Sequence, residues 1–263
     1  MWRRTLKGPK CYLLVTLVAN LTMSSCAGTP KDLFLTETLP PVDQIKTAVL
    51  MPLNFDHTAN ASLQDGLKKL ELELATQLNA AGIETIEPRM STVMGTWRML
   101  VKQANGESST SNTALSGPNY LAAREELAKR MLKAHPADMV VMPTLLFREG
   151  RYSGTRLKWD SVKRPVVMTE RAAGASTAMI KGKDRATSVR ITLFDREGHR
   201  VFERHGGIEP MTRYSMNDAF YFSEFQMKSK LRDDLFEDPW MITDGVRIAL
   251  EPWLVVPIPG EEN

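Results

Sequence analysis

Cysteine is scarce in this chain, and its scarcity limits the covalent structure. Among the 263 residues, the only cysteines are Cys11 and Cys26. Cys11 lies inside a predicted leader, so the mature chain would keep Cys26 alone and could form no internal disulfide. An unpaired cysteine in an exported protein calls for a chemical explanation, and for Cys26 the neighbouring residues supply one.

The sequence also lacks the short motifs that carry common enzyme chemistry. It contains no zinc-protease helix motif, no Walker phosphate loop, no dinucleotide-binding glycine fingerprint and no nucleophile-elbow pentapeptide. We therefore predict no catalytic residue, no metal site and no cofactor, and we expect a protein that is not an enzyme. An envelope hydrolase is the alternative, because an active site can be assembled from distant residues without any short motif.

A strong excess of positive charge is absent once the N-terminus is set aside. The whole chain has a formal net charge of +3. Residues 1–25 contain four basic residues, namely Arg3, Arg4, Lys7 and Lys10, and no acidic one, so the rest of the chain is close to neutral. Nucleic-acid-binding domains carry a marked basic surface, and we therefore expect no nucleic-acid partner.

The N-terminus has the three-part layout of a secretory signal. Residues 1–10 are basic, residues 11–22 form an apolar run, and the small residues Ser24 and Ser25 follow. The apolar run is shorter than the roughly 20 residues that a helix needs to cross a bilayer. We therefore predict that residues 1–25 are a cleaved signal peptide and not a permanent membrane helix.

The segment Met23-Ser24-Ser25-Cys26 resembles the bacterial lipobox, with methionine where that family usually has leucine. The resemblance implies that Cys26 is acylated with chains such as palmitate, becomes the mature N-terminus and anchors the protein to a membrane. Ala27 stands where an aspartate is associated with inner-membrane retention, which implies the periplasmic face of the outer membrane. An ordinary cleaved signal with an incidental cysteine is the alternative.

The chain after the signal is predicted to be a tether followed by one domain. Residues 26–44 are rich in proline and glycine and are typical of a linker that carries the lipid. Residues 45–256 alternate apolar strand patterns with amphipathic helix patterns, which favours a single α/β domain with two or three layers, a C-terminal hairpin and a C-terminal helix. Residues 257–263 are predicted to be a tail.

Apolar periodicity gives the expected elements of this domain. An apolar run predicts a strand over 45–53, and leucines at spacings of four and three predict a helix from Ser62 to Gly82. The other expected elements, in chain order, are a strand over 83–87, a helix over 93–104, a helix over 119–134 that Asn119 caps, a strand over 138–147, strands with long turns over 151–185, a hairpin over 187–195 and 200–208 with Gly198 at its turn, and a last helix from Asp238 to Trp253.

Three segments of this pattern resemble a group of bacterial envelope proteins. They are the strand Lys46–Leu53 with its leucine-striped helix, the run Ala137–Val141, and the hairpin Ile191–Glu203. Together they look like the small α/β domain of curli-secretion channel lipoproteins, of lipoprotein activators of penicillin-binding proteins, and of the N-terminal part of the Tol-system translocation protein. The resemblance implies a periplasmic interaction or assembly module with an envelope protein partner, and it transfers no catalytic residue.

Aromatic residues gather in one region near the C-terminus, although they make up only 7% of the chain. Aromatic side chains anchor many protein interfaces, so this group is a candidate interaction surface. Packing of the same rings onto the sheet is the alternative. The group consists of Tyr214, Phe220, Tyr221, Phe222 and Phe225.

Two sets of ionisable residues contain metal-ligating side chains but lack the arrangement of a metal site. His199 and His205 flank the predicted hairpin turn, but a metal site needs at least three placed ligands, so we expect solvated histidines. Four acidic residues lie before the last helix, namely Asp233, Asp234, Glu237 and Asp238. They lack the regular spacing of a calcium loop, and we expect them to interact with the helix dipole.

Overall fold

The computed structural model describes residues 33–55, 64–105, 117–168, 181–216 and 227–255. Its helices are η1 (Val42–Gln44), α1 (Gln64–Ala80), α2 (Met90–Asn105), α3 (Gly117–Ala134) and α5 (Pro239–Leu250). Its strands are β1 (Phe34–Leu35), β2 (Thr47–Leu50), β3 (Glu84–Ile86), β4 (Met139–Ser153), β5 (Arg156–Trp159), β6 (Val162–Pro165), β7 (Val167–Met168), β8 (Lys181–Phe194), β9 (Arg200–Pro210), β10 (Thr212–Met216) and β11 (Met227–Leu231).

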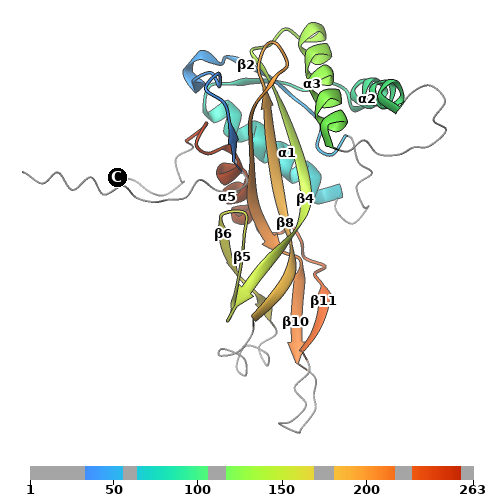
Figure 1. Ribbon diagram of the computed structural model, residues 1–263. Helices are drawn as coiled ribbons and strands as arrows, with labels where there is room; N and C mark the ends of the chain where they lie inside the picture. Colours follow the sequence, from blue (N-terminus) through green and yellow to red (C-terminus); the bar gives the residue numbers. More distant parts are fainter. Residues whose placement is uncertain (1–32, 56–63, 106–116, 169–180, 217–226, 256–263) are drawn as a thin grey trace, which may run out of the picture.

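The strands form a large mixed sheet and a small one. The large sheet has the order β1-β9-β8-β4-β2-β3, and β5 and β6 extend it beside β4. Strand β2 is parallel to both β3 and β4, whereas β4, β8 and β9 pair antiparallel. The small sheet has the order β11-β10-β7. In Figure 1 the long strands β4 and β8 run from the helical end of the molecule down to β10 and β11.

Helices cover both faces of the large sheet, so the α/β domain has three layers. Because side chains alternate along a strand, Ala48 and Leu50 point to one face and Val49 and Met51 to the other. The first pair packs in a core with α1 and α5, and the second packs in a core with α2 and α3. Figure 1 shows the two helix pairs on opposite sides of the strands.

Local sequence signals set the helix ends and the hairpin turn, as expected. The leucine stripe of α1 is buried, with Leu70 and Leu74 each 1% exposed, and Gly82 follows the helix with φ +80°. Gly198 occupies the β8–β9 turn with φ +78°. Asp238 caps α5, and its carboxylate accepts the backbone N–H of Trp240 at 3.0 Å.

Some boundaries differ from the expected ones. Helix α3 begins at Gly117, so Asn119 lies inside its first turn and is not the capping residue. Helix α5 ends at Leu250, and Trp253 packs against the first core from the turn that follows. Strand β4 continues to Ser153, because every residue in the second half of β4 pairs with a residue of β8.

The folded region begins before residue 45. Residues 34–35 form β1, which pairs with β9, and residues 42–44 form the short helix η1. Leu39 and Val42 pack against the first core. Part of the expected tether, residues 34–44, therefore belongs to the domain. Within the described residues, none of the helices is both long and apolar enough to cross a membrane.

Candidate functional site

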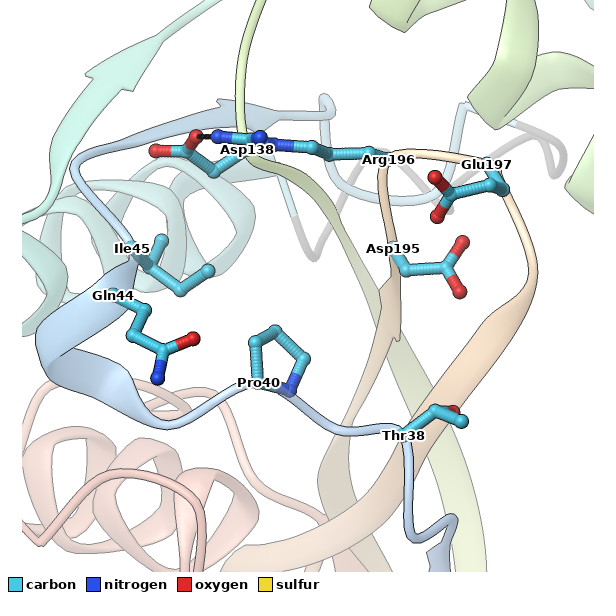
Figure 2. A pocket seen from close by; sticks show the side chains of 8 residues that line it. All are labelled: Thr38, Pro40, Gln44, Ile45, Asp138, Asp195, Arg196 and Glu197. Carbon is cyan, nitrogen blue, oxygen red and sulfur yellow. Dashed lines mark hydrogen bonds and ion pairs between the residues drawn. The ribbon is translucent and has the colours of Figure 1, made fainter.

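A pocket of about 410 Å³ lies where the N-terminal segment passes the β8–β9 turn. Figure 2 shows Thr38 and Pro40 along one side, Gln44 and Ile45 beside them, and the turn opposite. The remaining lining residues are Asp138, Asp195, Arg196 and Glu197. Three of the eight lining side chains are acidic and one is basic, so the pocket has an acidic lining.

The N-terminal wall of the pocket is fixed by contacts to two distant parts of the chain. After β1, the backbone N–H of Thr36 donates to the carbonyl oxygen of Val201 at 3.0 Å. The indole N–H of Trp253 donates to the carbonyl oxygen of Pro40 at 3.2 Å. Ile45 is buried in the first core. These contacts hold an otherwise irregular segment against the sheet.

Asp138 is the most constrained ionisable group in the pocket. Its Oδ2 accepts the backbone N–H groups of Lys46 at 2.7 Å and of Thr47 at 2.9 Å, and its Oδ1 pairs with the guanidinium of Arg196. Burial alone would raise the pKa of Asp138, but these donors and the positive charge outweigh it and lower the pKa from 3.8 to about 2. Asp138 therefore stays ionised and positions Arg196 over the pocket, as Figure 2 shows.

The turn presents its remaining acidic groups on a rigid frame. Asp195 Oδ1 accepts the backbone N–H of His199 at 2.7 Å, and its carbonyl oxygen accepts the N–H of Gly198 at 2.9 Å. Glu197 is exposed at the tip of the turn. Because Arg196 is paired with Asp138, the pocket can attract a cationic group through Asp195 and Glu197.

Sequence reasoning did not find this pocket. The sequence predicted Asp138 only as the start of a strand, Asp195 only as the end of one, and Arg196 and Glu197 only as part of a turn. A local signal did exist, since a charged Asp-Arg-Glu-Gly turn joins two apolar strands at 195–198. The meeting of that turn with Asp138 and the segment 38–45 is a tertiary contact that no spacing in the sequence encodes.

The expected site residues have different outcomes. Cys26, Phe220, Tyr221, Phe222 and Phe225 lie outside the described residues. Tyr214 on β10 is only 9% exposed and packs in a third core cluster with β5 and β6. The Tyr214 ring therefore does not belong to an exposed interaction surface, which corrects its assignment to the candidate surface.

The histidines and the acidic cluster behave as structural groups. His199 is exposed, and its Nδ1 lies 3.8 Å from Asp195 Oδ2, whereas His205 lies opposite Arg190 in the sheet. Asp234 accepts hydrogen bonds from two arginines, and the guanidinium of Arg232 holds the pKa of Asp234 below its usual value. In the part of the chain that the structure describes, no three or more histidine, cysteine, aspartate or glutamate side chains are grouped so that they could hold a metal ion.

Comparisons with known proteins add little to this geometry. No protein-family model matches the chain, and no curated protein matches it. One solved structure with some similarity is the peptide amidase PAM in complex with the competitive inhibitor chymostatin, at 14% identity and a TM-score of 0.20. The match covers 77% of this chain and spans only 42% of that one. A TM-score this low carries no argument about fold or function.

Proposed function

We propose that this chain is a lipid-anchored protein of the bacterial outer membrane whose α/β domain faces the periplasm and binds an envelope protein partner. The observation that carries the proposal is the unpaired Cys26, which follows a basic segment, an apolar run and two small residues. Acylation of that thiol would account for both the leader and the one cysteine that the predicted mature chain keeps.

The position of β1 limits how far such an anchor would let the domain move. Phe34 follows Cys26 by eight positions, and a fully extended chain of that length spans at most about 28 Å. Phe34 and Leu35 are already paired with β9. The domain would therefore stay close to the membrane surface, and so would the acidic pocket, whose wall is the segment 38–45.

The pocket at the β8–β9 turn is our candidate site for a protein partner. Its acidic groups Asp195 and Glu197, of which Glu197 is exposed, favour a lysine or arginine side chain on that partner. The turn and the segment 38–45 are both held by hydrogen bonds, so binding would cost little ordering of this protein. A preformed pocket of this kind suits recognition of a partner.

The anchor is tested by mass spectrometry of the mature N-terminus. We expect the wild-type protein to begin with an acylated Cys26, and we expect Cys26→Ser to be unlipidated and released from the membrane fraction. A wild-type protein with an unmodified Cys26 would refute the anchor.

The partner site is tested by pull-down of the tagged full-length chain from crosslinked envelopes. Glu197→Lys reverses one exposed charge in the pocket, and we expect it to reduce recovery of a stoichiometric partner by about tenfold, because like charges oppose docking. Glu84→Lys makes the same change at an exposed residue on β3 outside the pocket and should leave recovery unchanged. Equal recovery with both variants would exclude this pocket, and the absence of any stoichiometric partner would contradict the interaction function.

A further inference from the structure

The parallel part of the large sheet contains a point where two connections diverge. Strand β2 is followed by α1, which packs in the core on one face of the sheet. The adjacent strand β3 is followed by α2, which packs in the core on the other face. In open α/β sheets a crevice opens at the carboxyl ends of two such strands, and ligands bind there preferentially.

A second pocket, of about 220 Å³, lies in this crevice. Its walls are residues 50–52 at the end of β2, Glu71 on α1, Glu87 and Pro88 after β3, and Met90 at the start of α2. The end of β2, the segment that follows β3, and helices α1 and α2 therefore all border one cavity. It is smaller than the roughly 300–1,000 Å³ of sites for drug-sized ligands, so it suits a compact ligand or a single side chain.

The lining determines the chemistry that this cavity can accept. Two of its residues, Glu71 and Glu87, are acidic, and the others are uncharged. The Oε1 atom of Glu71 accepts the backbone N–H of Leu53 at 2.7 Å, which fixes the carboxylate at the cavity wall. The uncharged lining is largely apolar and comes from leucine, methionine and proline.

The negative charges of the two carboxylates repel each other. Burial raises the pKa of Glu71, the N–H of Leu53 partly offsets this, and the negative charge of Glu87 raises it further. A cation placed between the two groups would relieve the repulsion and supply hydrogen-bond donors to both. An ammonium group does so with three donors on one compact centre.

We infer that this crevice is a binding site for an ammonium group on a short alkyl chain. The ammonium lies between Glu71 and Glu87, and the alkyl chain contacts Pro52, Pro88 and Met90. The source of the group is a free alkylamine or the lysine side chain of a partner, which present the same chemistry to the cavity. The site is separate from the acidic pocket at the β8–β9 turn and does not depend on the function proposed for that pocket.

The test uses the purified full chain and n-butylammonium as the probe, with calorimetry for affinity and methyl NMR for location. We expect saturable binding that shifts the methyl signal of Met90, which is exposed and is assigned with the Met90→Leu variant. Glu71→Gln and Glu87→Gln should each weaken binding by about tenfold, because each removes one charged hydrogen-bond acceptor. Glu84→Gln, on β3 outside the cavity, should bind as the wild type does.

Further arms separate charge from shape and identify the source. n-Butanol has a similar size without the charge and should not bind. Blocked lysine amide that binds at the same residues assigns the group to a partner side chain, whereas binding of butylammonium alone assigns it to a free amine. Equal binding of butanol, no saturable binding, tighter binding of Mg²⁺ or Ca²⁺ at the same residues, or affinity unchanged in both glutamine variants would each overturn the assignment.

The folding of the variants provides an independent readout. Glutamine at position 71 keeps an oxygen that can accept the Leu53 N–H and removes the repulsion from Glu87. We therefore expect Glu71→Gln to be at least as stable as the wild type without ligand and to weaken only ligand binding. A variant that loses both stability and binding would show that Glu71 is a structural group, and the assignment would then fail.

Discussion

Arg232 extends from the end of β11 to Glu209 on β9, and its Nη1 lies 2.7 Å from Glu209 Oε2. The two side chains are only 8% and 1% exposed. Glu209 also accepts the backbone N–H of Phe236, and Arg232 also donates to Asp234. This buried pair therefore connects the large sheet with the small sheet and with the segment that leads into α5.

Removal of Arg232 alone should destabilise the domain strongly. Arg232→Ala leaves the Glu209 carboxylate buried without its counter-ion, and breaking a buried pair in this way costs about 3–5 kcal/mol. The free energy of unfolding from urea titration at neutral pH measures the loss. The double variant Arg232→Met with Glu209→Leu should lose much less, because both charges are removed together.

Arg213→Ala provides the matched comparison. Arg213 also pairs with Asp234, at 2.9 Å, but its side chain is 39% exposed, so its removal should cost only about 0–1 kcal/mol. Equal losses in Arg232→Ala and Arg213→Ala would show that burial of the Glu209 pair does not set its energetic importance.

The features predicted well from the sequence are those whose cause is local. A helix repeats every 3.6 residues, so the leucine stripe reported the buried face of α1 directly, including Leu70 and Leu74. Gly198 and Asp238 were predicted because turns and helix caps depend on the chemistry of one residue and its immediate neighbours. The α/β class followed from the alternation of these local patterns.

The features that were missed depend on contacts between distant residues. Asp138 is held by the backbone of Lys46 and Thr47, about ninety positions away in the chain. Strand β1 has two residues, too few to show any periodicity. The glycines and prolines of residues 151–185 had suggested strands with long turns, whereas residues 151–153 and 181–185 continue the paired strands β4 and β8, where Glu149 pairs with Lys183 at 2.6 Å.

The ionised state of Asp138 should contribute to stability in a pH-dependent way. Its pKa is lowered from 3.8 to about 2 in the folded protein, so its contribution is fully present above about pH 4 and is lost as the pH falls towards 2. Asp138→Asn should therefore be less stable than the wild type at neutral pH, and the difference should shrink between pH 4 and 2. Urea titrations across that interval measure it.

Arg196 provides a second variant for the same pH dependence. Arg196→Gln removes the positive charge that lowers the pKa of Asp138 but keeps the backbone donors from Lys46 and Thr47. Its acid-induced loss of stability should begin at a higher pH than in the wild type. A difference between Asp138→Asn and the wild type that stays constant from pH 7 to 2 would show that the charge of Asp138 makes no contribution.

The close approach of α5 to β9 should depend on Gly206. A Cβ atom at this position would lie 1.9 Å from the carbonyl oxygen of Gly245 and 2.8 Å from the backbone nitrogen of Ala249. Both atoms belong to the backbone of α5, so no side chain can rotate away to make room. Gly206→Ala must therefore shift the helix off the sheet. We expect this variant to lose at least the roughly 1–3 kcal/mol of unfolding free energy that an overpacked core costs.

Gly95→Ala makes the same change on the exposed face of α2, where a Cβ meets nothing within 4 Å, and should stabilise the protein by about 0.5–1 kcal/mol. Thermal melting of the two variants separates the effects, because a Gly206→Ala protein as stable as the wild type would mean that α5 does not pack this closely on β9.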